Sequence, residues 1–402
     1  MRPISTPVSD HPGTTDSGST RGRWFWIVTG TGVSVALGLG FGSLIVHAGT
    51  SNYGNVGPLI TLPTRTVTVT QPVTSLSVES YGANIQVTSK HVSRVTVVEA
   101  VSYDPTQGGP PAVTHRDVRG QLTLAAPACA NANCSVGFTV TVPTGVTVTA
   151  TGDGGSVTVS GTGAADLDSG GGPVVATGIT GPLDVTAAGG SVWASGATTA
   201  AIDSGGGPVT VARIPGPLSV HAEGGGVSVT SAGAADLDSG GGPVTATGIS
   251  GPLTITAEGG GVSVVSAPGA DIDSGGGPIT ATRINGALAI TAEGGGVDVD
   301  GVTGTLNANT GGGPLEATGV TSAAATVSAD GGGVTLEFAA VPQTVLVTTG
   351  GGTAMLSVPA GAYGVSVDTG GGPESVEIPT SPGAPNTISV STDGGGLQIS
   401  PA

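Results

Sequence analysis

The heptapeptide DSGGGPV occupies residues 168–174 and returns at 203–209 and 238–244, followed by DSGGGPI at 273–279. Other glycine clusters begin between these copies, at 189, 224 and 259, so the gaps between clusters alternate between 16 and 19 residues. One 35-residue period therefore contains two coils, a short one and a long one. Coils of this length are too short for a propeller blade and suit one turn of a β-helix.

The segments between the glycine clusters alternate in polarity. In PLTITAE at 252–258, Leu253 and Ile255 fall on one face of a strand, while Thr254 and Thr256 fall on the other. Alternation with period two, interrupted by Gly and Pro, indicates short strands with one solvated face. The sequence predicts an all-β fold, a single β-solenoid of about 14 or more short coils preceded by one transmembrane helix. Glycine corners are expected to supply positive φ angles and close contact between successive coils.

The 402 residues divide into five predicted segments. They are a disordered cytoplasmic tail at 1–23, a transmembrane anchor at 24–48, a linker at 49–64, irregular N-terminal β coils at 65–145, and Gly-rich solenoid repeats at 146–402.

The anchor is predicted from an uncharged stretch, WFWIVTGTGVSVALGLGFGSLIVHA at 24–48. A helix of this length spans the hydrocarbon core of about 30 Å. Arg21 and Arg23 precede the stretch and the next basic residue is Arg65, so the positive-inside rule places the N-terminus in the cytoplasm and the later residues outside. A cleaved signal peptide is the alternative, because VHA at 46–48 has the small residues of a cleavage site. Either reading exports the solenoid, and the expected location is the cell membrane.

Small residues also form a stripe within the anchor. Gly30, Ser34, Gly38 and Gly42 are four residues apart and share one helix face. Such a face lets two helices approach closely, which makes a homo-oligomer one expectation, although a glycine-rich composition also generates stripes by chance.

The charge of the chain is −17, and 21 acidic residues but only Arg213 and Arg283 among Lys and Arg follow residue 150. Binding to phosphate backbones needs clustered basic residues, so nucleic acid is excluded as a partner.

The glycine clusters do not match known ligand loops. A phosphate-binding loop needs a Lys and a Ser or Thr after the glycines, and none is present. The carboxylate pairs in DLD at 166–168 and 236–238 and in DID at 271–273 permit weak calcium binding, but calcium requires six to eight oxygen ligands. The simpler interpretation is that these aspartates form a solvated face. No cofactor is expected.

Catalytic patterns are absent from the sequence. The five histidines fit neither a nucleophile–base arrangement nor a zinc spacing, so the chain is predicted not to be an enzyme. Trp193 aligns with Ser228, Ser263 and Asp298 in later coils and is therefore expected to be exposed. Together with Arg213 and Arg283 it breaks the repeat, and these residues are the candidates for a binding patch.

Cys129 and Cys134 are the only cysteines, in CANANC. Outside the membrane we expect them to form a disulfide that closes a small loop and stabilises by roughly 2 kcal/mol.

The run FTVTVPTGVTVTATGDGGSVTVSG at 138–161 resembles the bacterial putative-adhesin repeat domain, as do LTITAEGGGVSV at 253–264 and YGVSVDTGGGPESVEI at 363–378. The resemblance covers about residues 66–400. It implies a β-solenoid in an envelope protein, often membrane-anchored, without established catalytic residues. The triple glycines and the strict alternation of short and long coils depart from the family pattern.

These features predict a membrane-anchored, extracytoplasmic β-solenoid that serves as a non-catalytic, adhesin-like binding surface or scaffold. An envelope protein or glycan is the expected ligand. The alternatives are a structural element that assembles end to end, because the last coil DGGGLQISPA at 393–402 has no evident cap, and a weak calcium-binding repeat protein.

Overall fold

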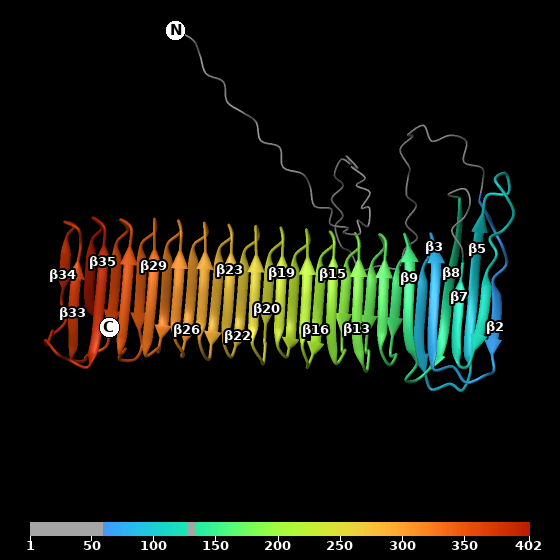
Figure 1. Cartoon of the computed structure of the whole chain (residues 1–402), viewed down its shortest axis with the longest axis horizontal. Coiled ribbons are helices and arrows are strands. Elements are labelled where there is room, and N and C mark those ends of the chain that lie inside the picture. The colour runs from blue at the N-terminus through green and yellow to red at the C-terminus, as the bar shows by residue number, and fades with distance from the viewer. Residues whose placement is uncertain (1–58, 127–132) are drawn as a thin grey trace, which may run out of the picture. The chain divides into compact units, whose positions relative to one another are not determined.

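The computed structural model describes residues 59–126 and 133–402, and these residues form an all-β solenoid (Figure 1). The expected tail and anchor, with Gly30, Ser34, Gly38 and Gly42, lie outside the described residues, and so does Cys129. Within the described part of the chain no helix could cross a membrane.

Two long sheets make up the solenoid. Sheet A contains, in spatial order, β1 (Ile60–Thr61) and β2 (Arg65–Val69) side by side on β5 (Val95–Tyr103), then β8 (Cys134–Pro143), β4 (Ile85–Lys90), β10 (Val157–Ser160), β12 (Val174–Thr177), β14 (Val192–Ser195), β16 (Val209–Ile214), β18 (Val227–Ala232), β20 (Val244–Thr247), β22 (Val262–Ala267), β24 (Ile279–Ile284), β26 (Val297–Val302), β28 (Leu315–Val320), β30 (Val334–Phe338), β32 (Ala354–Val358), β36 (Leu397–Pro401) and β34 (Glu374–Val376).

Sheet B contains, in spatial order, β6 (Thr114–Val118), β7 (Gln121–Ala125), β3 (Ser75–Tyr81), β9 (Thr147–Asp153), β11 (Ala165–Ser169), β13 (Pro182–Ala187), β15 (Thr199–Ser204), β17 (Leu218–Ala222), β19 (Ala235–Ser239), β21 (Leu253–Ala257), β23 (Ala270–Ser274), β25 (Leu288–Ala292), β27 (Leu306–Thr310), β29 (Ala324–Ala329), β31 (Thr344–Thr349), β35 (Asn386–Thr392) and β33 (Tyr363–Asp368).

Each rung consists of one sheet B strand, a glycine corner, the next sheet A strand and a return corner. Strands of successive rungs pair in parallel and in register, as Leu237 on β19 does with Val220 below and Ile255 above. From β9–β10 to β31–β32, chain order and spatial order agree over about 12 turns. The β-solenoid expected from the sequence is therefore confirmed, although its regular part is shorter than the 14 or more coils inferred from the glycine clusters.

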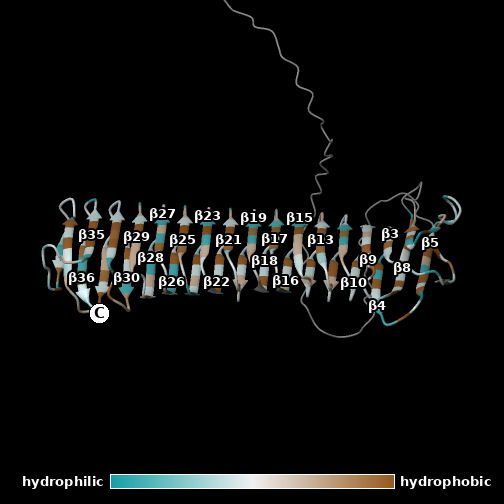
Figure 2. Cartoon of the chain, turned by 60° about the horizontal axis from the view of Figure 1, so that its bottom comes forward, coloured by the Kyte–Doolittle hydropathy of each residue, from teal (hydrophilic) through white to brown (hydrophobic). Residues whose placement is uncertain are grey.

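The hydrophobic core lies between the two sheets. Val244 and Ala246 on β20, and Leu237 and Ile255 from sheet B, are at most 2% exposed, whereas Thr254 between Leu253 and Ile255 faces solvent. Figure 2 shows the resulting alternation of apolar and polar residues along the strands. Burying one such Leu, Ile or Val side chain contributes about 1.5–3 kcal/mol. Small Val and Ala side chains dominate, which keeps the two sheets close together.

Glycine is required at the corners mainly because successive rungs approach closely there. A Cβ on Gly207, the third glycine of its cluster, would lie 2.2 Å from the carbonyl oxygen of Gly190 in the preceding rung. A Cβ on Gly206 would meet nothing within 4 Å. The expected close contact is confirmed, but the expectation of positive φ is wrong at both positions, since neither has φ in the left-handed region.

A buried serine fixes the conformation of each DSGGGP corner. The hydroxyl of Ser204, at the end of β15, donates a hydrogen bond of 3.0 Å to the carbonyl oxygen of Gly207. Ser169 and Ser239 repeat this contact at 2.7 and 2.8 Å. Buried carbonyl groups need a hydrogen-bond donor, and the buried serine hydroxyl supplies one to the carbonyl of the third glycine in each corner.

The C-terminal end of the solenoid is not built in chain order. The last strands of the sequence, β35 and β36, lie between β31–β32 and β33–β34, and the rung β33–β34 is outermost. The sequence-based assumption that every coil stacks on the one before it is wrong here, because β35 and β36 pair with β31 and β32 and separate them from β33 and β34.

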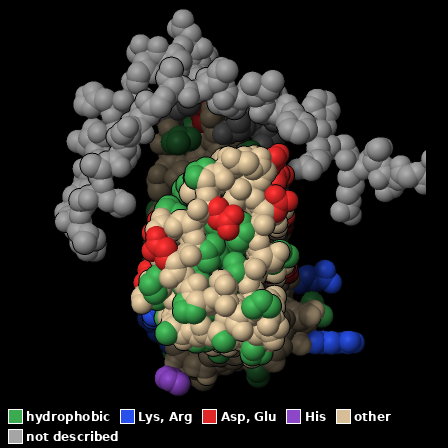
Figure 3. All heavy atoms as spheres, turned by 90° about the vertical axis from the view of Figure 1, so that its left-hand side faces the viewer, with side chains coloured by type: hydrophobic (Ala, Val, Ile, Leu, Met, Phe, Trp, Pro, Cys, Tyr) green, Lys and Arg blue, Asp and Glu red, His purple; other side chains and the backbone are tan. Residues whose placement is uncertain are grey.

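The outermost rung ends the core without a covering layer. Val367 on β33 is half-buried, whereas its neighbour Val390 on β35 is fully buried. On β34, Glu374 occupies the register position of the buried Leu397, directly after Pro373. Short edge strands, proline and charge at an inward position all hinder the addition of another strand. Figure 3 shows acidic and apolar side chains on this end. The coil at 393–402, for which no cap was expected, is therefore not the outermost one, and Glu374 lies on the rung that is.

The N-terminal end is closed by antiparallel strands. β5 pairs antiparallel with β8 in sheet A, and β6 pairs antiparallel with β7 in sheet B. The rung β3–β4 lies between β7–β8 and β9–β10, so chain order is broken at this end too.

Candidate functional site

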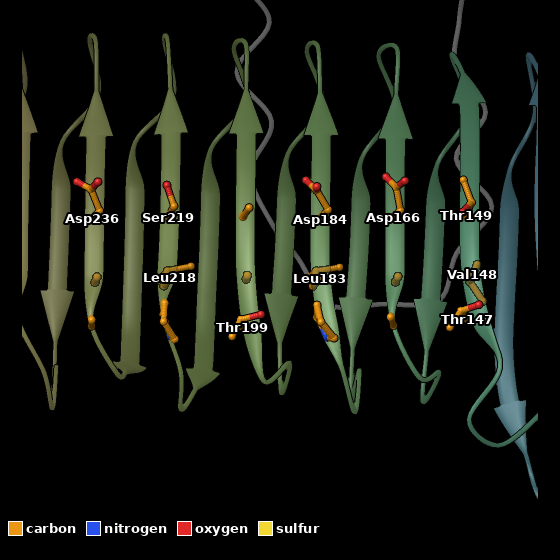
Figure 4. A pocket seen from close by; sticks show the side chains of 18 of the residues that line it. Thr147, Val148, Thr149, Asp166, Leu183, Asp184, Thr199, Leu218, Ser219 and Asp236 are labelled. Carbon is orange, nitrogen blue, oxygen red and sulfur yellow. The ribbon is translucent and has the colours of Figure 1, made fainter. Parts of the chain in front are cut away.

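The outer face of sheet B is acidic. Outward positions on β11, β13, β15, β19 and β23 carry aspartates in two lines along the solenoid, namely Asp166, Asp184, Asp236 and Asp271 in one and Asp168, Asp203, Asp238 and Asp273 in the other. A shallow trench of about 770 Å³ runs along the first line, as Figure 4 shows. Besides these aspartates, its lining includes Thr, Ala and Pro residues at or just before the start of the sheet B strands, together with Val148, Leu183 and Leu218.

His221 is the only basic side chain on this face between β9 and β25. Its Nδ1 lies 2.9 Å from Oδ2 of Asp238 in the next rung, and both side chains are about half exposed. An exposed pair of this kind contributes little to stability. Among residues 59–126 and 133–402, no group of three or more His, Cys, Asp or Glu side chains could hold a metal ion.

The outer face of sheet A differs from that of sheet B in its charge. From β14 to β24 no outward position carries a carboxylate. On β16 to β24 most outward side chains carry a hydroxyl group, namely Thr210, Ser228, Thr230, Thr245, Thr247, Ser263, Thr280 and Thr282; the exceptions are Ala212 and Val265. Carboxylates begin only with Asp298 and Asp300 on β26.

Trp193 on β14 lies at one end of this hydroxyl-rich face. Its side chain is 50% exposed, as its alignment with outward serines predicts. It is in register with Val175 on β12 and Thr210 on β16. An indole in this position offers a flat apolar surface next to a row of hydroxyl groups.

The return corners contain the strained residues of the repeat region. At or just after the end of each sheet A strand from β10 to β28 there is one residue with φ between +55° and +79°. Across successive rungs this position is occupied by Gly161, Gly178, Gly196, Arg213, Ser231, Gly248, Ser266, Arg283, Gly301 and Gly319. Glycine adopts this conformation freely, whereas other residues incur a cost of about 1–2 kcal/mol. The four exceptions to glycine fall within five successive rungs.

Arg213 and Arg283 are the first and last of these exceptions. Both side chains are exposed, and neither forms an ion pair with a described carboxylate. They lie four rungs apart on one edge of the hydroxyl-rich face, a separation of about 19 Å at the usual strand spacing. The structure thus brings Trp193, Arg213 and Arg283 to one face. We call this face, from β14 to β24 with its return corners, the arginine–tryptophan face.

Sequence reasoning missed Ser231 and Ser266 as members of this set. The sequence could have identified them, because Ser231 and Ser266 align with Gly178 and Gly248 and therefore occupy a position at which glycine is preferred. The predicted disulfide between Cys129 and Cys134 stays a prediction, since Cys129 is outside the described residues.

No known protein-family model matches this chain, and no curated protein is significantly similar to it. Among solved structures, the chain is similar to a crystal structure described as a putative adhesin from Parabacteroides distasonis ATCC 8503. The identity is 11%, the match covers 86% of this chain and 98% of the other, and the TM-score is 0.22. This similarity is too low to establish a shared fold or function. The β-solenoid that the family resemblance implied is present, but no family model supports membership.

Proposed function

We propose that this chain is a single-pass envelope protein whose solenoid, held outside the cell by the segment 24–48, acts as a non-catalytic binding surface or scaffold. The observation that carries the proposal is the unequal chemistry of the two outer faces. Sheet B carries aspartates, while the neighbouring rungs of sheet A carry hydroxyls, one exposed tryptophan and two arginines that form no ion pair within residues 59–126 and 133–402. A rod that only separated two domains would not require such a difference.

The adhesin-like role also agrees with the shape of the polar surface. The candidate residues lie on a flat strand face rather than in a deep cleft, and catalysis requires groups that converge on one reacting atom. Flat repeat surfaces suit extended ligands that contact many rungs at once.

End-to-end assembly is less well supported than binding. The outermost rung has a three-residue edge strand, β34, with Glu374 at an inward register position and Pro373 before it. These features oppose strand addition from a second copy. Weak calcium binding would rely on the aspartate lines of sheet B, which offer two carboxylates per rung at most.

Exposure of the full chain to protease on intact bacterial cells tests the proposal. We expect the solenoid to be degraded from outside and the chain to remain with the membrane fraction after alkaline extraction. Replacing Leu44 and Ile45 by Arg should abolish both membrane retention and surface exposure. Recovery of intact, protected chain in the cytoplasm would contradict the proposal.

A further inference from the structure

We propose that the arginine–tryptophan face binds a linear acidic polysaccharide, which lies along the solenoid axis with its carboxylates on Arg213 and Arg283 and a sugar ring on Trp193. This inference rests on the proposed function and gives it a site and a ligand class.

The charges of the described residues restrict where a polyanion can approach. The aspartates on the outer face of sheet B repel it, and so do Asp298, Asp300 and Glu316 on β26 and β28. Between β14 and β24 the outer face of sheet A carries no carboxylate. Arg213 and Arg283 are the only basic side chains of the repeats apart from His221, which belongs to the acidic face. The arginine–tryptophan face is therefore complementary to a negative ligand.

The backbone at the two arginines is a second observation, independent of charge. Arg213 has φ of +56° and Arg283 of +55°, at a position where six of the ten aligned residues are glycine. Residues held in this conformation at a cost are associated with functional sites. No described carboxylate compensates for the strain at either residue. A guanidinium that forms no ion pair with the described part of the chain can bind a ligand carboxylate bidentately.

The surface between the arginines is shaped for a chain rather than a point ligand. The left-handed positions between the two arginines are occupied by Ser231, Gly248 and Ser266. These side chains are small, and two of them carry hydroxyl groups. The adjoining strand positions add hydroxyls in three of the five rungs, namely Thr230, Thr247 and Thr282. Hydroxyl ladders can pair with sugar hydroxyls along a length of about 19 Å, the distance spanned by four rungs.

Trp193 selects a sugar over other polyanions. Its 50% exposed indole lies one rung before β16, the strand that carries Arg213. The flat face of an indole packs against the apolar face of a pyranose ring, whereas polyphosphate has no such surface. Along the solenoid, Trp193 comes first, followed by Arg213, the hydroxyl-bearing rungs and Arg283; Trp193 is in register with Thr210, three residues before Arg213 on β16.

Binding of polygalacturonate to the full chain, compared with its fully methyl-esterified form, tests the proposal. The ester keeps the sugar backbone and removes the charge. We expect wild-type chain to bind polygalacturonate and to lose affinity steeply with salt, and to bind the ester at least tenfold more weakly, because the charge-assisted hydrogen bonds are lost. Failure of wild-type chain to bind, or equal affinity for both polymers, would overturn the proposal.

Variants then locate the site. Arg213→Gly with Arg283→Gly should weaken binding by about tenfold or more, and Trp193→Ser by severalfold. Both glycine substitutions suit the local backbone, so loss of folding is not expected. Arg116→Ser on β6 removes a charge away from the face and should leave affinity unchanged. If all variants bind like wild type, the face is not the site. Surface exposure measured on cells separates this failure from failure of the proposed function.

Discussion

The carboxylate of Glu99 contacts the imidazole Nε2 of His115 inside the N-terminal end of the solenoid. Glu99 lies on β5 in sheet A and is 3% exposed, while His115 lies on β6 in sheet B. The pair therefore links the two sheets where the aliphatic core ends. A buried carboxylate tolerates this position only while it has a partner.

Replacing His115 by Leu should destabilise the fold by about 3–5 kcal/mol, because Glu99 would stay buried without a partner. The double substitution of Glu99 and His115 by Leu should recover most of this loss, since no charge would then be buried. Chemical denaturation followed by circular dichroism measures both. Equal stability of wild type and His115→Leu would show that the pair does not hold the end together.

Gly207→Ala should destabilise by about 1–3 kcal/mol or more, as overpacking of a rigid neighbour does. The added methyl would lie 2.2 Å from the Gly190 carbonyl oxygen, so the rungs would have to move apart. Gly206→Ala in the same cluster is the matched control and should change stability by less than about 1 kcal/mol. Similar melting temperatures for the two variants would contradict the close-contact explanation of the corners.

Arg213→Gly should raise stability by about 1 kcal/mol, because it removes a residue with φ of +56° and replaces it with one that adopts this conformation without strain. Gly248 lies directly after β20, at the position that aligns with Arg213. Gly248→Arg would place an arginine in the left-handed conformation and should lower stability by a similar amount. Thermal unfolding of the two variants against wild type provides the measurement. A destabilised Arg213→Gly would mean that the arginine side chain makes a stabilising contact within the fold.

Glu374→Val should promote end-to-end association of the chain. The substitution would place an aliphatic side chain in register with Leu397 on an edge strand whose outer side has no pairing partner among the described strands. Sedimentation at increasing concentration would reveal oligomers. Glu377→Val, directly after β34, removes one negative charge as well and should remain as monomeric as wild type. If both variants associated, the loss of a charge, and not the position of Glu374 on the edge strand, would explain the association.

Tyr363 should make the fold sensitive to alkali. Burial raises the pKa of Tyr363 above its ordinary value of 10.0, so the folded state keeps the proton that the unfolded state releases. The stability contributed by this difference is complete below about pH 10 and falls as pH rises further. In Tyr363→Phe the hydrogen bond of 2.8 Å to the Pro359 carbonyl oxygen is lost, which costs about 1 kcal/mol at neutral pH.

The stability difference between wild type and Tyr363→Phe should therefore shrink between pH 8 and pH 11. Urea midpoints across this range test the expectation. A constant difference would show that Tyr363 titrates in the same way in both states.

Much of the fold follows from short-range patterns. The alternation around Leu253 and Ile255 predicts the strands, and the spacing of the glycine clusters predicts the two-strand rung. The spatial order at the ends could not be predicted in this way. Gly352, Gly372 and Gly395 each belong to a triple-glycine cluster, yet Gly372 lies against Gly395, and Gly395 lies against Gly352. Which corners become neighbours depends on tertiary contacts that no local pattern encodes.

The candidate site was predictable in part. Trp193, Arg213 and Arg283 differ from their aligned residues, and that difference is visible in the sequence. That these three residues lie on one face was not predictable. The net charge of −17 does not reveal a surface without carboxylates, which becomes evident only when the outward positions are assigned to one sheet or the other. The left-handed φ of the arginines likewise became apparent only from the backbone.

The insertion of β35–β36 beneath β33–β34 has a consequence for biosynthesis. A ribosome releases β35 and β36 after β33 and β34, yet β35 and β36 lie between that rung and the rest of the stack. The outermost rung therefore has no strands to pair with until Asn386–Pro401 have emerged. A nonsense mutation before Asn386 would leave β33 and β34 without their pairing strands, instead of merely removing the outermost rung.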